Sequence, residues 1–232
     1  HLKKKSPNKE VLTLVQTVDN KPYLEYDGEY YRIYDFIENS VCLQIPRDTN
    51  EFYQSAVSFG DFTCMLGDFD ATQLYEILPN FHNTVNRFKN FEASLEANLS
   101  GRAHLATEEI NFALARKGIV SKIVSLIESG KMPLKVTHND TKLNNVLLNA
   151  ETLAGLAVID LDTVMPGSVC CDFGDSIRFG CNSSYEDEED LSKVYFKMDM
   201  FEAYVKGYLS TMKNITEVEK EHLVDGAILM TF

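Results

Sequence analysis

Four polar residues stand at fixed spacings in one stretch of the chain. His138, Asp140 and Asn145 form the pattern H-x-D-x-x-x-x-N, and Asp160 follows 20 positions after Asp140. Transfer of a phosphoryl group to an alcohol needs a carboxylate that orients the hydroxyl and accepts its proton. It also needs hard oxygen ligands for the Mg²⁺ that accompanies the nucleotide phosphates. These residue types therefore indicate Asp140 as the catalytic carboxylate, and Asn145 and Asp160 as metal ligands.

The elements around these residues explain how they could meet. Two short apolar runs, residues 145–148 and 156–159, predict strands, and the turn residues before Gly155 predict that the strands form a hairpin. Asn145 would then begin one strand and Asp160 would end the next. His138 is expected to support the loop from behind rather than to react. Each residue alone is more often an ordinary loop residue, whereas the full set in this arrangement favours chemistry.

Composition and charge limit the class of protein. Hydrophobic residues make up 44% of the chain and charged residues 25%, which are values of a globular protein. A net charge of −13 argues against nucleic acid or an anionic membrane surface as the main partner. No apolar run reaches the roughly 20 residues that span a bilayer, and no signal peptide is recognisable. Five cysteines without a C-x-x-C motif indicate reduced thiols and a cytoplasmic protein; the Cys170–Cys171 pair favours packing over a redox or metal site.

The apolar periodicity changes along the chain. Residues 11–18, 23–26 and 29–37 predict antiparallel strands, and from residue 50 the spacing becomes helical. The expected helices cover residues 50–66, 70–78, 84–95, 108–128, 191–211 and 216–231, with Gly118 as a weak point and 174–185 as a loop. This order predicts an α+β fold. Residues 1–40 would form part of a β lobe with its hinge, residues 41–232 a mostly helical lobe that carries the catalytic loop, and residues 39–50 the linker.

Several stretches resemble the aminoglycoside phosphotransferase and choline kinase family, most of all the branch that includes N-acetylhexosamine 1-kinase. They are residues 31–40, 81–88, 138–145, 158–163 and 165–178. The resemblance implies a protein-kinase-like fold, ATP and Mg²⁺ as cosubstrates, and phosphorylation of a small-molecule hydroxyl. For that branch the acceptor would be the anomeric hydroxyl of an N-acetylhexosamine. In such a fold, Asp35, Phe36 and Ile37 would offer backbone groups to adenine.

The triplet Asp172-Phe173-Gly174 matches the metal-binding triplet of protein kinases, but its position argues against that role. It lies 32 positions beyond the catalytic carboxylate and follows a loop, whereas Asp160 has the expected spacing and a strand before it. Asp160 is therefore preferred as the metal ligand. Asp172 is expected to hydrogen-bond loop amides near the site.

Other polar residues near these motifs allow more than one interpretation. Asp162 could lie on the same side as Asp160 and serve as a supporting or sugar contact. Arg178 is expected to brace Asp172 or Asp175, with contact to substrate as the alternative. His82 and Arg87 are expected to pack and to hydrogen-bond at a helix end.

The chain departs from the family at its start. No segment before residue 11 supplies a glycine-rich phosphate loop or the lysine that grips the phosphates. We therefore expect an excised part of a kinase that, alone, binds ATP weakly and turns over little or nothing. Two alternatives stay open: a kinase of another small alcohol, such as choline, homoserine or an aminoglycoside, or a kinase-like module without turnover.

Overall fold

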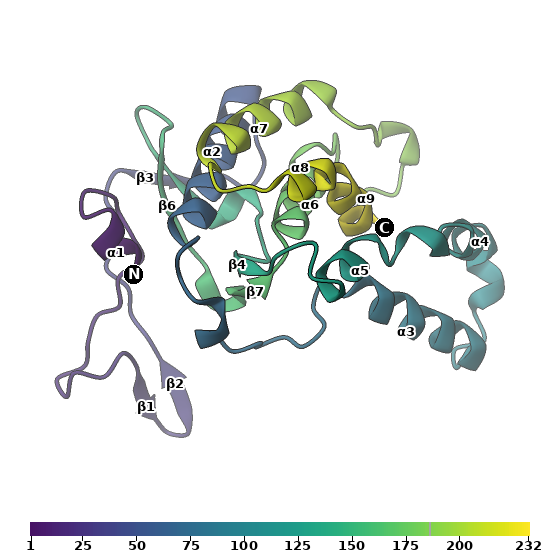
Figure 1. Ribbon diagram of the computed structural model, residues 1–232, viewed down its shortest axis with the longest axis horizontal. Helices are drawn as coiled ribbons and strands as arrows, with labels where there is room; N and C mark the ends of the chain where they lie inside the picture. The colour runs from purple at the N-terminus through teal and green to yellow at the C-terminus, as the bar shows by residue number, and fades with distance from the viewer. Residues whose placement is uncertain (186) are drawn as a thin grey trace.

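The computed structural model describes residues 1–185 and 187–232. The protein consists of small antiparallel sheets and a larger set of helices (Figure 1). The strands are β1 (Leu24–Tyr26), β2 (Glu29–Tyr31), β3 (Ser40–Cys42), β4 (Lys135–Thr137), β5 (Val146–Asn149), β6 (Gly155–Val158) and β7 (Met165–Gly167). The α-helices are α1 (Leu2–Lys5), α2 (Thr49–Met65), α3 (Thr84–Ala97), α4 (Thr107–Ala115), α5 (Lys122–Glu128), α6 (Val169–Gly180), α7 (Met198–Thr211), α8 (Glu217–Glu221) and α9 (Leu223–Thr231). Short 3-10 turns are η1 (Ala71–Gln73), η2 (Ala103–Ala106), η3 (Lys117–Ile119), η4 (Leu143–Asn145), η5 (Leu161–Thr163) and η6 (Leu191–Lys193).

The expected hairpin is present as β5 and β6. The two strands pair antiparallel, with Val146 opposite Val158, and β3 pairs with the other edge of β5, with Val41 opposite Leu148. Alternate residues of β5 are buried, and Phe59 of α2 packs on that face. The stretch 39–50, predicted as the linker between the lobes, therefore includes β3. The resulting three-stranded sheet holds the hairpin on α2.

A second small sheet leads into the predicted catalytic loop, which begins at His138. Strands β4 and β7 pair antiparallel, with Val136 opposite Pro166, and β4 ends at Thr137, directly before His138. Val136 packs with Phe62 of α2 in an apolar cluster. The loop that follows β4 therefore starts from a buried, paired strand.

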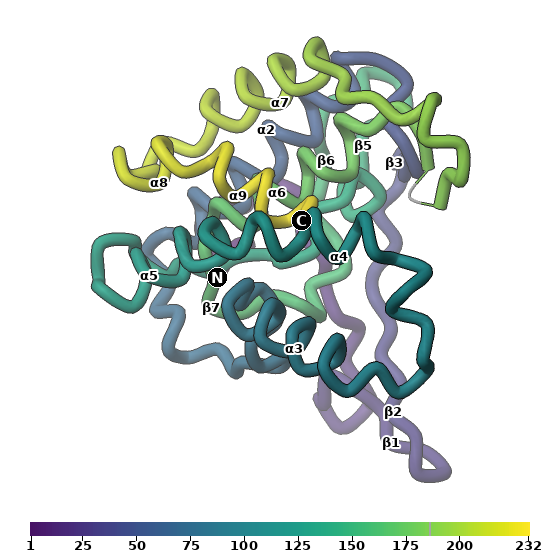
Figure 2. Tube along the Cα trace, turned by 90° about the vertical axis from the view of Figure 1, so that its right-hand side faces the viewer, coloured from purple at the N-terminus to yellow at the C-terminus, as the bar shows by residue number. Residues whose placement is uncertain are grey.

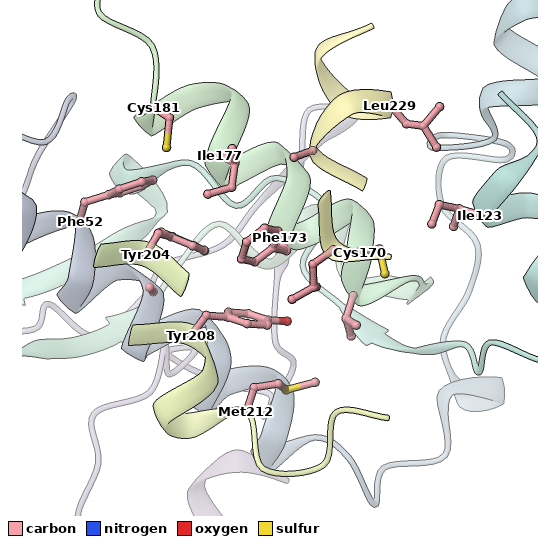
Figure 3. Close-up of a cluster of buried hydrophobic side chains, with 14 of the residues drawn as sticks. Phe52, Ile123, Cys170, Phe173, Ile177, Cys181, Tyr204, Tyr208, Met212 and Leu229 are labelled. Atoms are coloured by element: carbon pink, nitrogen blue, oxygen red, sulfur yellow. The ribbon is translucent and has the colours of Figure 1, made fainter. Parts of the chain in front are cut away.

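The largest apolar core joins α2, α6, α7 and α9 (Figure 3). Phe173 of α6 lies edge-on to Tyr204 and Tyr208 of α7, with ring centroids 5.6 and 5.5 Å apart. The prediction of a loop over residues 174–185 is wrong for residues 174–180, because α6 continues to Gly180. Gly174 and Gly180 weaken the helical pattern of the sequence, but each lies where a neighbouring element approaches too closely for a side chain.

Cysteines contribute to this core as packing groups. Cys170 and Cys171 are buried on α6, and all five cysteines are free thiols. Burial raises the pKa of Cys170 to about 12 and raises that of Cys171 well above its usual range. Thiols held in the protonated form are poor nucleophiles and poor metal ligands, which agrees with the expected packing role of this pair.

Helices α3 and α4 form an arm beside the main body, seen in front in Figure 2. The single helix predicted over residues 108–128 is wrong, since α4, η3 and α5 divide that stretch. The interruption includes Gly118, which stabilises a helix interior less than any residue except proline. Within residues 70–78 only η1 is helical, and Pro79 disfavours helical backbone at Leu78.

The last two predicted helices are also shorter than expected. Residues 191–211 form η6 and then α7 from Met198, and residues 216–231 break at His222 into α8 and α9. In the N-terminal part, residues 11–18 contribute only a bridge between Leu14 and Tyr34 instead of a strand. The strand predicted over 29–37 ends at Tyr31, and the β1–β2 hairpin projects from the body (Figure 1). Within the described residues, no helix has the length and apolarity needed to cross a membrane.

The close packing of α6 on α9 gives a testable consequence. A methyl group at Gly174 would overlap the backbone of Gly226, so Gly174→Ala must push two buried helices apart. We expect this change to lower the free energy of unfolding by about 1–3 kcal/mol, measured by urea denaturation. Gly118→Ala is the matched control, since its new methyl group meets no atom within 4 Å. Equal stability of the two variants would contradict this account of the helix crossing.

Candidate active site

The side chains of Asp140 and Asn145 are in direct contact. The amide nitrogen of Asn145 donates to the Asp140 carbonyl at 2.8 Å and to its carboxylate oxygen Oδ2 at 3.0 Å. Asn145 is buried at the end of η4, and the Asp140 carboxylate keeps part of its surface exposed. The Asn145 contact therefore fixes the rotamer of a carboxylate that solvent and ligands can still reach.

His138 joins the Asp140 loop to the strand that ends before Asp160. The backbone N–H of Asp140 donates to His138 Nδ1 at 3.3 Å, so the ring proton lies on Nε2, which donates to the Ile159 carbonyl at 2.8 Å. Burial lowers the pKa of His138, which keeps the ring neutral. His138 therefore supports the loop from behind, as a spacer between two segments.

The proposed metal ligands have oxygens to offer. Both hydrogen bonds of the Asn145 side chain use its nitrogen, so its amide oxygen is free of hydrogen bonds in the described part of the chain. The Asp160 carboxylate likewise forms no hydrogen bond with the described residues. No cluster of three His, Cys, Asp or Glu side chains able to hold a metal occurs among the residues described. One amide and one carboxylate fit Mg²⁺, which is commonly held by few protein oxygens together with substrate phosphates and water.

Asp160 has a left-handed backbone conformation, with φ 57° and ψ 59°. Non-glycine residues adopt this region rarely, at an energy of about 1 kcal/mol or more, and such residues concentrate at functional sites. Asn139 has the same feature, with φ 67°. A hydrogen bond links the two segments: the Asn139 side chain donates to the carbonyl of Thr163, three residues past Asp160, at 2.9 Å.

Helix α6 holds the amide groups of the catalytic loop. Asp172 accepts hydrogen bonds from the backbone N–H groups of His138 and Asn139, both at 2.8 Å, and Asp175 accepts from that of Thr141 at 2.9 Å. Asp172 is only 2% exposed, and burial raises the pKa of its carboxyl to about 7. These contacts agree with the expectation that Asp172 hydrogen-bonds loop amides. Asp172 itself lies on helix α6.

Side chains from three elements and one connecting segment hold the loop carbonyls. Those of His138, Asn139, Asp140 and Thr141 accept hydrogen bonds from Thr163 Oγ1 (2.6 Å), His82 Nε2 (3.0 Å), Asn145 Nδ2 (2.8 Å) and Ser176 Oγ (2.7 Å), respectively. Each backbone N–H and C=O of these four residues therefore has a side-chain partner.

Two cations lie close to the acids of the site. Lys142 Nζ is 3.4 Å from Asp140 Oδ1. Arg32, from the segment after β2, forms an ion pair with Asp162, which lowers the pKa of Asp162. Asp162 thus lies beside Asp160 in sequence but already has a cationic partner.

Arg178 pairs with Asp175, one of its two expected partners, at 2.9 Å. The residues of the predicted hinge occupy different environments: Phe36 is 84% exposed, whereas Ile37 is buried. The Asp35 amide donates to the Thr13 carbonyl, and the Ile37 carbonyl accepts from Ser40 Oγ. Within the described residues, the Asp35 and Phe36 carbonyls and the Phe36 and Ile37 amides form no hydrogen bond.

The α+β architecture, with Asp140, Asn145 and Asp160 around one hairpin, defines a protein-kinase-like fold. The sequence profile of the phosphotransferase enzyme family matches residues 11–209, and the chain belongs to this family.

Solved structures agree with this fold at low sequence identity. The match to a microcompartment-associated aminopropanol kinase covers 99% of this chain and 68% of the kinase chain, with 15% identity and a TM-score of 0.54. An ethanolamine kinase of Plasmodium vivax matches 99% and 60%, with 14% identity and a TM-score of 0.50. An aminoglycoside phosphotransferase from Streptomyces rimosus ATCC10970, in complex with ADP and streptomycin, matches 100% and 79%, with 12% identity and a TM-score of 0.50.

The sequence interpretation missed several members of the site. Asp175 was considered only as a partner of Arg178, and Ser176, Thr163 and Lys142 were not considered. Asp172, Asp175 and Ser176 have the i, i+3, i+4 spacing of one helix face. That spacing would have identified them if residues 169–180 had been assigned to a helix.

The buried carboxyl of Asp172 predicts a specific pH dependence of stability. Its pKa is about 7 in the folded protein and about 3.9 in an unfolded chain. Between these values the native state holds one more proton than the unfolded state, so the contribution of Asp172 to stability falls as pH rises from about 4 to 7. The wild-type unfolding free energy should therefore fall relative to that of Asp172→Asn over this range, in urea denaturation series at pH 5–8.

Asp162→Asn provides the control for this series. The pKa of Asp162 is lowered, so its titration lies below the range tested, and its curve should stay parallel to that of the wild type. A parallel curve for Asp172→Asn as well would exclude the raised pKa of Asp172.

Proposed function

We propose that the protein transfers the γ-phosphoryl group of ATP to a hydroxyl group of a small molecule, with Mg²⁺ as the metal. The observation that carries this proposal is the contact of Asn145 with the Asp140 carboxylate, on a loop that His138 joins to the segment before Asp160. A carboxylate fixed by an amide, with oxygen ligands next to it, is what phosphoryl transfer to an alcohol requires.

Each residue has a distinct role in this proposal. Asp140 orients the acceptor hydroxyl and takes its proton as the new O–P bond forms and the bond from the γ-phosphorus to the bridging oxygen of ADP breaks. Asn145 Oδ1 and the Asp160 carboxylate would hold Mg²⁺, which when bound neutralises charge on the nucleotide phosphates. Lys142, 3.4 Å from Asp140, adds positive charge on the acceptor side.

The hinge at Asp35, Phe36 and Ile37 is the proposed adenine site. Its free backbone groups are the Asp35 and Phe36 carbonyls and the Phe36 and Ile37 amides, and the exposed Phe36 ring offers apolar surface. The described residues contain no glycine-rich phosphate loop, so we propose that residues 1–232 alone bind ATP weakly. The division into lobes near residue 40 is part of the same proposal.

The change that tests the reaction is Asp140→Asn in the intact protein. The asparagine side chain has nearly the size of aspartate but cannot take the hydroxyl proton, so kcat should fall about 10²–10⁴-fold. A coupled assay of ADP release measures this loss. Glu151→Gln, on the exposed turn at the far end of the same hairpin, is the matched control and should keep full activity. An Asp140→Asn variant with normal turnover would exclude Asp140 as the base.

The proposed acceptor is an N-acetylhexosamine, phosphorylated at its anomeric hydroxyl. Support comes from residues 31–40, 81–88 and 165–178, which resemble the branch with that activity. The solved structures with the same fold are named for aminopropanol, ethanolamine and aminoglycoside substrates, so the acceptor panel must include these alcohols.

We expect N-acetylglucosamine or N-acetylgalactosamine to give at least about tenfold higher kcat/KM than choline, homoserine, ethanolamine, aminopropanol or an aminoglycoside, a difference of about 1.4 kcal/mol in transition-state binding. The same coupled assay, with the product position determined by phosphorus NMR, decides this. A preference for an amino alcohol would overturn the sugar assignment while keeping the reaction class. Absence of phosphoryl transfer to every acceptor would favour a module without turnover.

A further inference from the structure

The peptide between Asn139 and Asp140 is held by a residue from outside the core. Asn139 has the unusual φ of 67°, and its carbonyl accepts a hydrogen bond from His82 Nε2 at 3.0 Å. His82 lies 57 positions earlier in the chain, in the segment between η1 and α3. This bond restrains the backbone one residue before the proposed catalytic carboxylate.

The protonation state of His82 follows from its surroundings. Its Nδ1 atom is buried without a hydrogen-bond partner, so a proton on Nδ1 would be a buried, unsatisfied donor. Burial lowers the pKa of the ring, which agrees with a neutral imidazole. The ring proton must therefore lie on Nε2, the nitrogen that faces the Asn139 carbonyl.

The start of α3 fixes the position of the imidazole. The Arg87 side chain donates to the Phe81 carbonyl at 2.8 Å and lies over the Phe81 ring, which contacts the His82 ring at a centroid distance of 4.4 Å. Asn83 caps the helix by accepting a hydrogen bond from the Asn86 amide. His82 thus extends from a capped helix end, which limits its freedom to follow a moving loop.

The other side chains that hold the catalytic loop come from α6, from the loop itself with η4, and from η5. His82 alone among these partners in the described structure comes from the segment that leads into the α3–α4 arm, whose place beside the body Figure 2 shows. Without the His82 bond, the carbonyl of the Asn139–Asp140 peptide would have no partner, while Asn139 would still hold a left-handed conformation. A peptide in that condition can rotate and displace the Asp140 side chain.

We propose that His82 is a positioning residue for phosphoryl transfer: through Asn139 it sets the place of the Asp140 carboxylate and makes the base of the α3–α4 arm part of the catalytic machinery. This inference rests on the proposed function. A displacement of about 1 Å in a reacting group can lower a rate about 100-fold. The effect should therefore fall on kcat, since His82 supports the base rather than a ligand.

The test compares two replacements of His82 in the intact protein. His82→Leu removes the donor, and we expect kcat to fall about 10–100-fold, with KM for ATP and for the acceptor within about twofold of wild type. His82→Gln retains an N–H donor of similar reach and should recover most of kcat. His104→Gln is the control, because His104 lies exposed on the arm and, among the described residues, its side chain bonds only the local Gly101 carbonyl.

The outcomes separate this inference from the proposed function. An active wild type together with unchanged kcat in His82→Leu would overturn the positioning role, as would equal loss in the Leu and Gln variants or a change confined to KM. An inactive wild type would instead overturn the phosphotransferase proposal. Nitrogen-15 NMR of the wild-type imidazole gives a test that needs no folded variant: we expect the proton of His82 on Nε2, and a proton on Nδ1 would contradict the inference.

Discussion

The catalytic loop depends on one constraint: four consecutive peptide units are buried outside helix and strand, and all their hydrogen bonds must come from side chains. Buried backbone groups without partners are strongly unfavourable, so such a loop exists only where a surrounding framework supplies both donors and acceptors. Here α6 supplies the acceptors Asp172 and Asp175, and His138 Nδ1 accepts from the Asp140 amide. The donors to the carbonyls come from α6, η4, η5 and the segment before α3. The shape of the loop is therefore a property of the packed protein, and residues 138–141 alone do not determine it.

Helix α6 has two faces with separate tasks, and the packing of one determines the other. Phe173 and Ile177 lie in the apolar core against α7 and α9, while Asp172, Asp175 and Ser176 face the catalytic loop. The hydroxyl of Tyr204 on α7 donates to Ser176 at 2.6 Å, which connects the core to the loop directly. Close approach of α9, which requires glycine at Gly174, sets the depth of α6. Core packing and loop geometry are consequently coupled through one 12-residue helix.

This coupling explains what the sequence could and could not predict. The hairpin and the proximity of Asp140 to Asn145 follow from local spacing. Asn145 lies five positions after Asp140 and directly precedes β5. Helix α6 was missed because Gly174 and Gly180 and its two aspartates have low helix propensity, and tertiary packing outweighs that preference. His82 was assigned to packing, since a bond across 57 positions leaves no periodic signal. Position in the chain therefore predicted the contact between Asp140 and Asn145 better than it predicted the side chains that support their loop.

The same supports explain how a chain with net charge −13 could handle an anionic nucleotide. Asp172 and Asp175 direct their oxygens at loop amides and at Arg178, so these carboxyl groups do not face the proposed phosphate site. Asp162 is paired with Arg32, and Asp140 lies beside Lys142. Asp160 is left as a carboxylate without a hydrogen-bond partner in the described chain, and the residue before it, Ile159, donates its amide to the Asn145 backbone carbonyl at 2.9 Å. The Asp160 carboxylate would add negative charge near the phosphates of a bound nucleotide, and Mg²⁺ held by Asp160 and Asn145 would offset that charge in the proposed reaction.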